Sequence, residues 1–521
     1  MGLSTLADGA AIYYTTDGSV PTPSGGTLYS APVPVAATTV LRAGAFRPGE
    51  APLRIATRTF LFLDDILAQP ALPAGYPGTW QPGVAADYAM DASVGTAAEI
   101  KAALRALPTV SVVMPIDDLF NPSTDPAVGG MYSNSTIARG REWERRCSAE
   151  FFDFPHGQEI QLDCGARIFG NASRATSRSK HNMRLAFRRA YGAPNLEFPV
   201  FGGDAHPEKV NGYLLRGQNG DSWFHPAAGQ RQEALYIRDQ VARSAHAAMD
   251  RPETRQDHVH LYLNGLYWGV FNTIERIEDN AMAERFGGAD EEWDVIKSSR
   301  VAGMEVVSGS LDQWREVQAL AEAGVAGDAE YAAIQEFLDL PNMIDFLLVN
   351  FYNGNSDWDD NNFQAARRRV PGDKWRFFVW DSERTLLSPT ANNTGLNHAD
   401  RVTRLHTMLR QNAEYRLLFA DRIHRHFFNG GILTPDGMRA EFNRWVDFLR
   451  GPLLAESARW GDNYRAGNPY TVGGEWQAEV DYMHNTYMAG RTDTVLAQLA
   501  AQGLYPAVAP RPSTSMAATS P

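Results

Sequence analysis

Carboxylate and amide side chains gather in one short stretch of the sequence, Asp357-Trp358-Asp359-Asp360-Asn361-Asn362. Two strand-like segments follow, 363–369 and 375–380, which are joined by the turn Pro371-Gly372 and end at Asp381. A turn centred between Pro371 and Gly372 pairs residues whose numbers sum to 743. This predicts that Asn362 lies opposite Asp381, about 5 Å away. Oxygen ligands grouped in this way suit Mg²⁺ or Mn²⁺ beside a phosphate-bearing substrate.

Other chemistries can be weighed against the same stretch. A calcium loop of the EF-hand type is excluded, because Asn362 stands at its sixth position, where Gly is needed, and Arg368 at its twelfth, where Glu is needed. A solvated acidic turn without function stays open. So does a glycosidase acid/base pair, whose two carboxylates would come from Asp357, Asp360, Asp381 or Glu383.

The spacing Asp-x₄-Asn with a later Asp is typical of phosphoryl transfer in kinase-like folds. There an Asp orients the attacking hydroxyl, an Asn five positions on holds one metal ion, and a second Asp holds the metals that bridge the phosphates. Asp357, Asn362 and Asp381 match these roles in order.

A basic segment in the first half of the chain could supply the cations that nucleotide phosphates need. Gly165–Arg174 leads to Lys180 and then to the strand-like run Met183–Phe187. A strand, a turn of small residues and a second strand with a lysine is the arrangement that covers the phosphates of ATP. The segment contains few glycines, so a solvated basic hairpin is the alternative.

The elements that must position these residues are strands in the first half and helices in the second. A helix over 341–352, capped by Asp339 and ending near Gly354, leads into the acidic loop. The other expected helices are 311–323, 402–428, 435–448 and 475–502. The expected strands are 110–114, the two around Cys147 and Cys164, 183–187, 212–216 and 259–273.

Composition limits the class of protein. The 521 residues include 61 acidic and 48 basic side chains, a formal net charge of −13, so nucleic acid is not an expected partner. No apolar run reaches the ~20 residues of a membrane-spanning helix, and the N-terminus lacks the order of a signal peptide. We therefore expect no transmembrane segment, and we interpret the chain as the mature part of something longer.

The two cysteines are expected to face each other. A hairpin turn centred on Pro155-His156 pairs residues whose numbers sum to 311, and Cys147 and Cys164 satisfy this. Facing positions on antiparallel strands can carry a disulfide, which would indicate an extracytoplasmic compartment. Two buried neighbouring thiols are the equal alternative.

Four segments follow from the pattern of strands, prolines and helices. We predict an all-β module at 1–63, a linker rich in Pro, Gly and Ala at 64–106 that ends in a short helix, one large α+β domain at 107–506, and a flexible tail at 507–521. The first segment, with Ile12-Tyr13-Tyr14-Thr15-Thr16-Asp17-Gly18-Ser19-Val20-Pro21-Thr22, resembles the chitobiase/β-hexosaminidase C-terminal type of β-sandwich module. That resemblance implies a spacer or a weak carbohydrate-binding role, for instance towards the cell wall.

The large domain resembles the CotH kinase family, the spore-coat-protein-H type of atypical protein kinase. The stretches that carry the resemblance include Trp143-Glu144-Arg145, the segments 163–174 and 261–270, Asp357-Trp358 and Val379-Trp380-Asp381. The resemblance implies a divergent protein-kinase-like fold that binds ATP with a divalent metal. It also implies phosphorylation of serine, with threonine as the alternative, in a Ser-rich segment of a partner protein at the cell surface.

By matching position, the resemblance gives each residue a role. Lys180 would contact phosphates, Asp357 would be the catalytic carboxylate, and Asn362 and Asp381 would be metal ligands. Glu383 stands where the family often has a second metal-binding Asp. Nucleotide contact or support of the site is expected of Arg174, Arg216 and Glu275; for Glu275, a structural pairing with Arg276 or Arg238 is the alternative. A kinase-like scaffold without transfer activity, or a phosphotransferase acting on a small-molecule or glycan hydroxyl, remains an alternative function.

Overall fold

The computed structural model describes residues 1–50, 52, 54–81, 83–201 and 209–505. The chain forms two compact units. Unit 1 consists of Met1–Val241, Thr254–Trp293 and Phe442–Tyr482, and unit 2 of Ala242–Glu253, Asp294–Glu441 and Met483–Pro521. Unit 1 holds most of the strands and unit 2 is mainly helical, so the predicted α+β class is confirmed.

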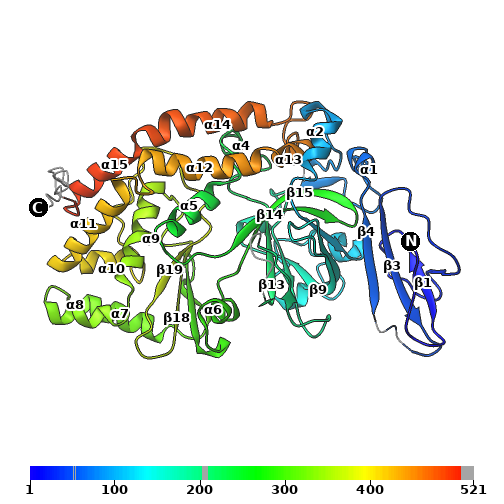
Figure 1. The fold of residues 1–521 in the computed structure, drawn as a ribbon, viewed down its shortest axis with the longest axis horizontal. Helices are drawn as coiled ribbons and strands as arrows, with labels where there is room; N and C mark the ends of the chain where they lie inside the picture. The colour runs from blue at the N-terminus through cyan, green and yellow to red at the C-terminus, as the bar shows by residue number, and fades with distance from the viewer. Residues whose placement is uncertain (51, 53, 82, 202–208, 506–521) are drawn as a thin grey trace, which may run out of the picture. The chain divides into compact units, whose positions relative to one another are not determined.

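The N-terminal module of unit 1 is one antiparallel sheet in the order β2-β1-β3-β4 (Figure 1). Its strands are Ala11–Thr15, Thr27–Leu28, Thr39–Phe46 and Ile55–Phe60 for β1 to β4. Within the described residues the module consists of this one sheet, which packs against the neighbouring barrel; the sandwich stays a prediction. On β4, the Thr59 hydroxyl lies 2.8 Å from that of Ser111, and the Thr59 amide donates to Glu150 at 2.9 Å.

The segment predicted as a linker is folded. It contains α1 (Leu63–Leu67), β5 (Thr79–Gln81), β6 (Val84–Ala85) and α2 (Ala97–Ala103). Thr96 and Glu99 form a capping box at the start of α2, which is the short helix that the sequence predicted. Ile100 and Leu104 pack in a buried cluster with Tyr267 and Ala455. The segment is therefore held in place by its apolar side chains, which are part of a buried hydrophobic cluster.

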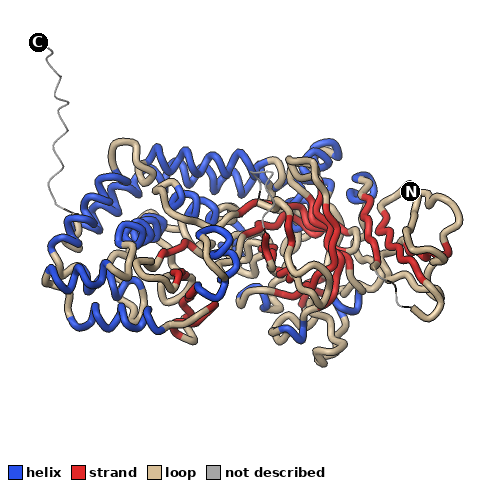
Figure 2. Tube along the Cα trace, turned by 60° about the horizontal axis from the view of Figure 1, so that its bottom comes forward, coloured by secondary structure: helices blue, strands red, loops and turns tan. Residues whose placement is uncertain are grey.

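A closed barrel of seven strands forms the centre of unit 1 (Figure 2). Its order is β10-β13-β15-β14-β7-β8-β9, and all neighbours are antiparallel except β14 and β7. The bounds are β7 Thr109–Val113, β8 Arg145–Phe152, β9 Ile160–Ile168, β10 Met183–Ala186, β13 Gly212–Arg216, β14 Gln256–Leu263 and β15 Leu266–Ile274. The segment 259–273 is a hairpin, because Asn264 and Gly265 take positive φ angles of 50° and 81° and form a tight turn.

Short elements complete unit 1. They are the two-stranded sheet of β11 (Leu196–Glu197) and β12 (Lys209–Val210), and the helices α3 (Ile116–Phe120), α4 (Ala228–Gln232), α6 (Asp279–Phe286), α13 (Leu453–Trp460) and α14 (Gln477–Tyr482). Helices α5 (Arg238–Ala247) and α12 (Pro435–Arg450) each contribute residues to both units.

Unit 2 contains a four-stranded sheet in the order β17-β16-β18-β19. The strands are β16 Trp293–Ser299, β17 Gly303–Ser308, β18 Phe363–Arg368 and β19 Arg376–Val379, and the helices are α7 Asp312–Ala323, α8 Asp328–Gln335, α9 Leu340–Asn353, α10 Val402–Leu409, α11 Ala413–Phe427 and α15 Met488–Ala501. Asp339 caps α9 and Gly354 ends it, as predicted. The expected single helix over 402–428 is two helices, because the Asn412 side chain caps α11 by accepting from the Glu414 amide at 2.8 Å.

The predicted cysteine register is confirmed, with Cys147 directly opposite Cys164. The structure has two free, buried thiols whose sulfur atoms lie 3.4 Å apart. The contact with Cys147, together with burial, raises the pKa of the Cys164 thiol. Within the described part of the chain, no helix has the length and hydropathy needed to span a bilayer. The predicted tail 507–521 lies outside the described residues.

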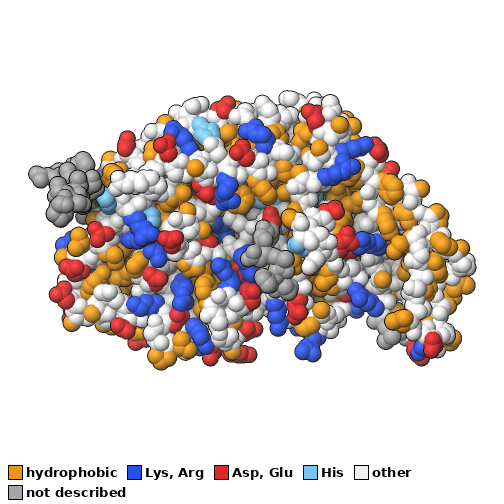
Figure 3. Space-filling view, viewed as in Figure 1, with side chains coloured by type: hydrophobic (Ala, Val, Ile, Leu, Met, Phe, Trp, Pro, Cys, Tyr) orange, Lys and Arg blue, Asp and Glu red, His pale blue; other side chains and the backbone are white. Residues whose placement is uncertain are grey.

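On the face shown in Figure 3, basic and acidic side chains are interspersed. The formal net charge of −13 is therefore a sum over both signs, and local basic groups can exist on this acidic protein.

Candidate active site

The acidic loop after α9 is held in a defined conformation by hydrogen bonds to Asp357. One carboxylate oxygen of Asp357 accepts from Arg300 at 2.8 Å, and the other accepts from the Asn362 amide at 2.9 Å. Arg300 follows β16 and also donates to Asp360 at 2.8 Å. One arginine thus bridges two carboxylates of the loop, and one face of Asp357 remains partly exposed, with 31% of its side chain accessible.

Asn362 and Asp381 lie side by side, although not in the predicted strand register. The ladder pairs Phe363 with Val379, so residue numbers sum to 742 and the predicted register is wrong by one residue. The reason is the connecting loop, which is centred on Pro371 itself and is closed by Asp373, whose carboxylate accepts from the Arg368 amide at 2.6 Å.

Asn362 and Asp381 are joined by a hydrogen bond from the side chain of Asn362 to the main chain of Asp381. The Asn362 amide donates to the main-chain oxygen of Asp381 at 3.3 Å, as well as to Asp357. Asn362 and Asp381 have φ angles of 52° and 56°, a left-handed conformation that Asn and Asp tolerate better than most residues. The structure therefore brings together the three residues that the sequence singled out.

Asp359 anchors the loop, which the sequence did not reveal. It is fully buried and accepts hydrogen bonds from the Thr403 amide at 2.9 Å and from the Thr403 hydroxyl at 3.0 Å. Its carboxylate lies 2.6 Å from Nδ1 of His398, and this hydrogen bond raises the pKa of His398. Asp359 is therefore committed to holding the loop on the start of α10.

The donor set of the loop fits a hard divalent cation. Mg²⁺ in phosphate-transfer sites is held by one or two carboxylates together with substrate phosphates. Asp357 and Asn362 place a carboxylate and an amide side by side, the main-chain oxygen of Asp381 contacts the same amide, and Glu383 is buried two residues beyond Asp381. Among the described residues there is no group of three or more His, Cys, Asp or Glu side chains that could hold a metal by themselves.

Lys180 lies in unit 1 and is completely buried. It precedes β10 rather than standing on the strand. Its ammonium group donates to Glu456 at 2.7 Å and to the main-chain oxygen of Val270 at 2.5 Å, and it lies 4.4 Å from the centre of the Phe271 ring. Burial lowers the pKa of Lys180 to about 8, and the Glu456 carboxylate opposes that shift.

Glu456 is a residue that sequence reasoning missed. It lies on α13, 276 positions after Lys180, and its second oxygen accepts from the Val270 amide at 2.7 Å. No local pattern signals such a contact. The only available signal was an acidic residue in the mostly apolar segment Leu453–Ala458.

Arg174 and Arg216 make internal contacts. The buried guanidinium of Arg174 donates to the main-chain oxygens of Gly170 at 2.7 Å and of Ile168 and Ala138, and burial lowers its pKa to about 10. Arg216 donates to the buried carboxylate of Asp239 at 2.5 Å. These contacts build the barrel, and a contact with nucleotide stays a prediction for both residues.

Glu275 is also buried and paired. Its partners among the described residues include Arg255 and Arg285, which donate to it at 3.1 Å each, whereas the structural alternative named Arg276 or Arg238. The expected pairing is therefore found, but with different arginines. These partners come from the start of β14 and from α6.

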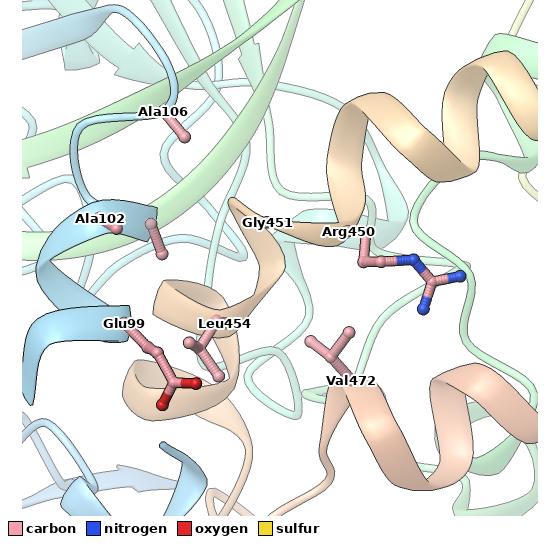
Figure 4. A pocket seen from close by; sticks show the side chains of 8 residues that line it. Glu99, Ala102, Ala106, Arg450, Gly451, Leu454 and Val472 are labelled. Atoms are coloured by element: carbon pink, nitrogen blue, oxygen red, sulfur yellow. The ribbon is translucent and has the colours of Figure 1, made fainter. Parts of the chain in front are cut away.

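Unit 1 also contains a pocket of about 450 Å³, which is separate from these residues (Figure 4). Its apolar walls come from α2, Ala106, Leu454 of α13 and Val472. Its charged groups are already engaged, because Glu99 caps α2 and Arg450 donates to Gln477 at 2.6 Å. None of the residues predicted to act on a substrate lines it.

The family model of the CotH kinase protein matches residues 167–495, which is more than half of the chain. The chain belongs to the CotH kinase protein family. Every residue predicted for the site lies within the matched range, as does Glu456. The model of the chitobiase/beta-hexosaminidase C-terminal domain matches residues 1–57, so both resemblances seen in the sequence are confirmed. No curated protein matches the chain significantly.

Proposed function

We propose that this CotH kinase family member is an ATP- and divalent-metal-dependent protein kinase with a kinase-like fold, and that it phosphorylates serine, or threonine, in a Ser-rich segment of a partner protein. The observation that carries the proposal is the convergence of Asp357, Asn362 and Asp381 in the order that phosphoryl transfer requires. Family membership supports the reaction class.

Asp357 is the proposed catalytic residue. It would accept the proton of the acceptor hydroxyl while Arg300 and Asn362 keep its carboxylate in one orientation. Asn362 and Asp381 would hold the metal, with Glu383 as a further ligand. When bound, the metal would neutralise the charge of the β- and γ-phosphates.

The Lys180–Glu456 pair supports the same proposal. In protein kinases a lysine that contacts the nucleotide phosphates is held by a glutamate ion pair. Lys180 has such a partner in Glu456. We propose that Lys180 acts on the phosphates, that Glu456 is its positioning residue, and that Arg174, Arg216 and Glu275 support the nucleotide site from within the barrel.

The test is transfer of label from γ-³²P-ATP to a Ser-rich peptide in the presence of Mg²⁺ or Mn²⁺. Asp357→Asn should lower the rate about 10²–10⁴-fold. Asp360→Asn is the matched control, because Asp360 lies in the same loop, is equally exposed and shares Arg300. Absence of transfer by the wild type, or equal rates in the two variants, would contradict the proposal.

The N-terminal module favours a second, compatible role. Its match to the chitobiase/beta-hexosaminidase C-terminal domain supports binding of an extracellular or cell-wall carbohydrate and a location at the cell surface. Retention of the full chain on cell-wall polysaccharide, measured with Asp357→Asn as well, tests this role independently of transfer. Transfer to a glycan or small-molecule hydroxyl in place of the peptide would support the alternative phosphotransferase.

A further inference from the structure

Two arginines of the barrel lie directly opposite each other on neighbouring strands. Arg184 of β10 pairs in register with Arg167 of β9. Like charges in facing positions of an antiparallel pair destabilise a sheet. Arg188 lies two residues beyond the end of β10 and shares the carboxylate of Glu144 with Arg167. Arg276, just beyond the end of β15, completes a group of four, which we call the arginine cluster.

Among the residues that the structure describes, two carboxylates face the arginine cluster. Glu144 lies 2.9 Å from Arg188 and 3.9 Å from Arg167. Glu278 is paired with Arg276 and lies 3.5 Å from Arg184. The charged groups that act on Arg167 and Arg184 are these same six residues. Counted over the described residues, four guanidinium groups against two carboxylates leave a local charge of about +2 on a protein whose net charge is negative.

Arg184 forms the floor of the cluster. It is only 6% exposed, and its Nε has no hydrogen-bond partner among the residues that the structure describes. Its guanidinium lies over Gly212 of β13, where a Cβ atom would come within 2.8 Å of Nε. The glycine thus makes room for a guanidinium that the protein does not neutralise fully. Burial and the three neighbouring arginines lower the pKa of Arg184 to about 10.

We propose that the arginine cluster binds a dianionic phosphate group, carried either by a nucleotide or by a phosphorylated segment of a partner protein. Arg167, Arg188 and Arg276 form a partly exposed rim around Arg184. Guanidinium groups present paired N–H donors that match phosphate oxygens. The two negative charges of such a group would balance the excess positive charge of the arginine cluster. The proposal concerns binding in unit 1 and does not depend on phosphoryl transfer.

The test is titration of the full chain with inorganic phosphate by calorimetry, against chloride at the same ionic strength. The wild type should bind phosphate, and Arg167→Gln/Arg276→Gln should bind at least tenfold more weakly. Arg58→Gln, which removes an ion-paired surface arginine of the N-terminal module, should bind like the wild type. Circular dichroism checks folding, and Arg188→Gln replaces the double variant if that variant does not fold.

Competition then identifies the source of the phosphate. It is measured in the Asp357→Asn background without divalent metal, so that its outcome is independent of the proposed kinase activity. Displacement of phosphate by ATP supports a nucleotide, and displacement by a phosphoserine peptide but not by its unphosphorylated form supports a partner protein. Phosphate binding that neither displaces would mean an adventitious ion only. That result, absence of phosphate binding, or equal affinity of the cluster variants and Arg58→Gln would overturn the proposal.

Discussion

Removing either member of the Lys180–Glu456 pair should destabilise unit 1 by about 3–5 kcal/mol, because the remaining charge is left buried without a partner. Neither side chain is exposed, and the charged atoms lie 2.7 Å apart. At an effective dielectric constant of about 20, that separation corresponds to an attraction of about 6 kcal/mol. Desolvation offsets much of it, so the net value of the pair is far smaller than the cost of breaking it.

A double-mutant cycle measures the coupling. We expect Lys180→Met and Glu456→Gln to cost about 3–5 kcal/mol each, and the double variant to cost at least ~2 kcal/mol less than their sum. The measurement is urea unfolding followed by tryptophan fluorescence. If the two effects add to within about 0.5 kcal/mol, the side chains do not interact as described, and the positioning role of Glu456 is refuted.

The pH dependence of stability gives a second measure of the same site. Burial lowers the pKa of Lys180 from 10.5 to about 8, so the folded state loses this proton before the unfolded state does. Below pH 8 both states are protonated and folding bears the cost of the buried charge. Between pH 8 and 9.5 the free energy of unfolding should rise, by about 2 kcal/mol from this group. The double variant should lack this rise.

Three further outcomes test other parts of the structure. Gly269→Ala should lower the free energy of unfolding, measured in urea, by at least ~2 kcal/mol more than Gly287→Ala. Both glycines have positive φ, but only at 269 would a Cβ atom meet the carboxylate of Glu456, at 2.5 Å. Arg300→Gln should tighten Mg²⁺ binding severalfold in calorimetry, since it removes a competing cation, and weaker binding would contradict a metal site in the loop. The same variant should change the free energy of unfolding by less than about 1 kcal/mol, because Arg300 is 54% exposed. Cys147 and Cys164 should react slowly with a thiol reagent in the native protein. After unfolding without reductant, two thiols per chain should react, whereas a disulfide would leave none to react.

Short-range signals were sufficient for much of the fold. The cap at Asp339, the strand Gly212–Arg216 and the facing cysteines depend on residues close in sequence, and each is present in the structure. The register of the second hairpin was wrong by one residue, because its loop is closed by a side chain of Asp373 that reaches back to the Arg368 amide. Such a bond is invisible when a turn is assigned from Pro and Gly alone.

Contacts between residues far apart in the sequence are the part of the candidate site that could not be predicted. The partner of Lys180 lies 276 residues away, and Asp359 finds its partners on α10. Neither contact has a periodic or local sequence pattern. The module at the N-terminus illustrates the same point, since β4 packs on the barrel through Thr59 and Glu150, a contact on which the sequence alone made no prediction.

The polar and charged residues that the sequence assigned to one site differ in their exposure in the structure. A charge inside a β-rich core needs an internal partner, and Arg174, Arg216 and Glu275 all have one. The pairing that was the structural alternative for Glu275 is thus present, and nucleotide contact stays a prediction for all three residues. Asp357 and Asn362 keep partial exposure while their positions are fixed by hydrogen bonds, which is what an open ligand site requires. The decisive substitutions for phosphoryl transfer are thus those in the loop, and substitutions of the buried arginines should first lower stability.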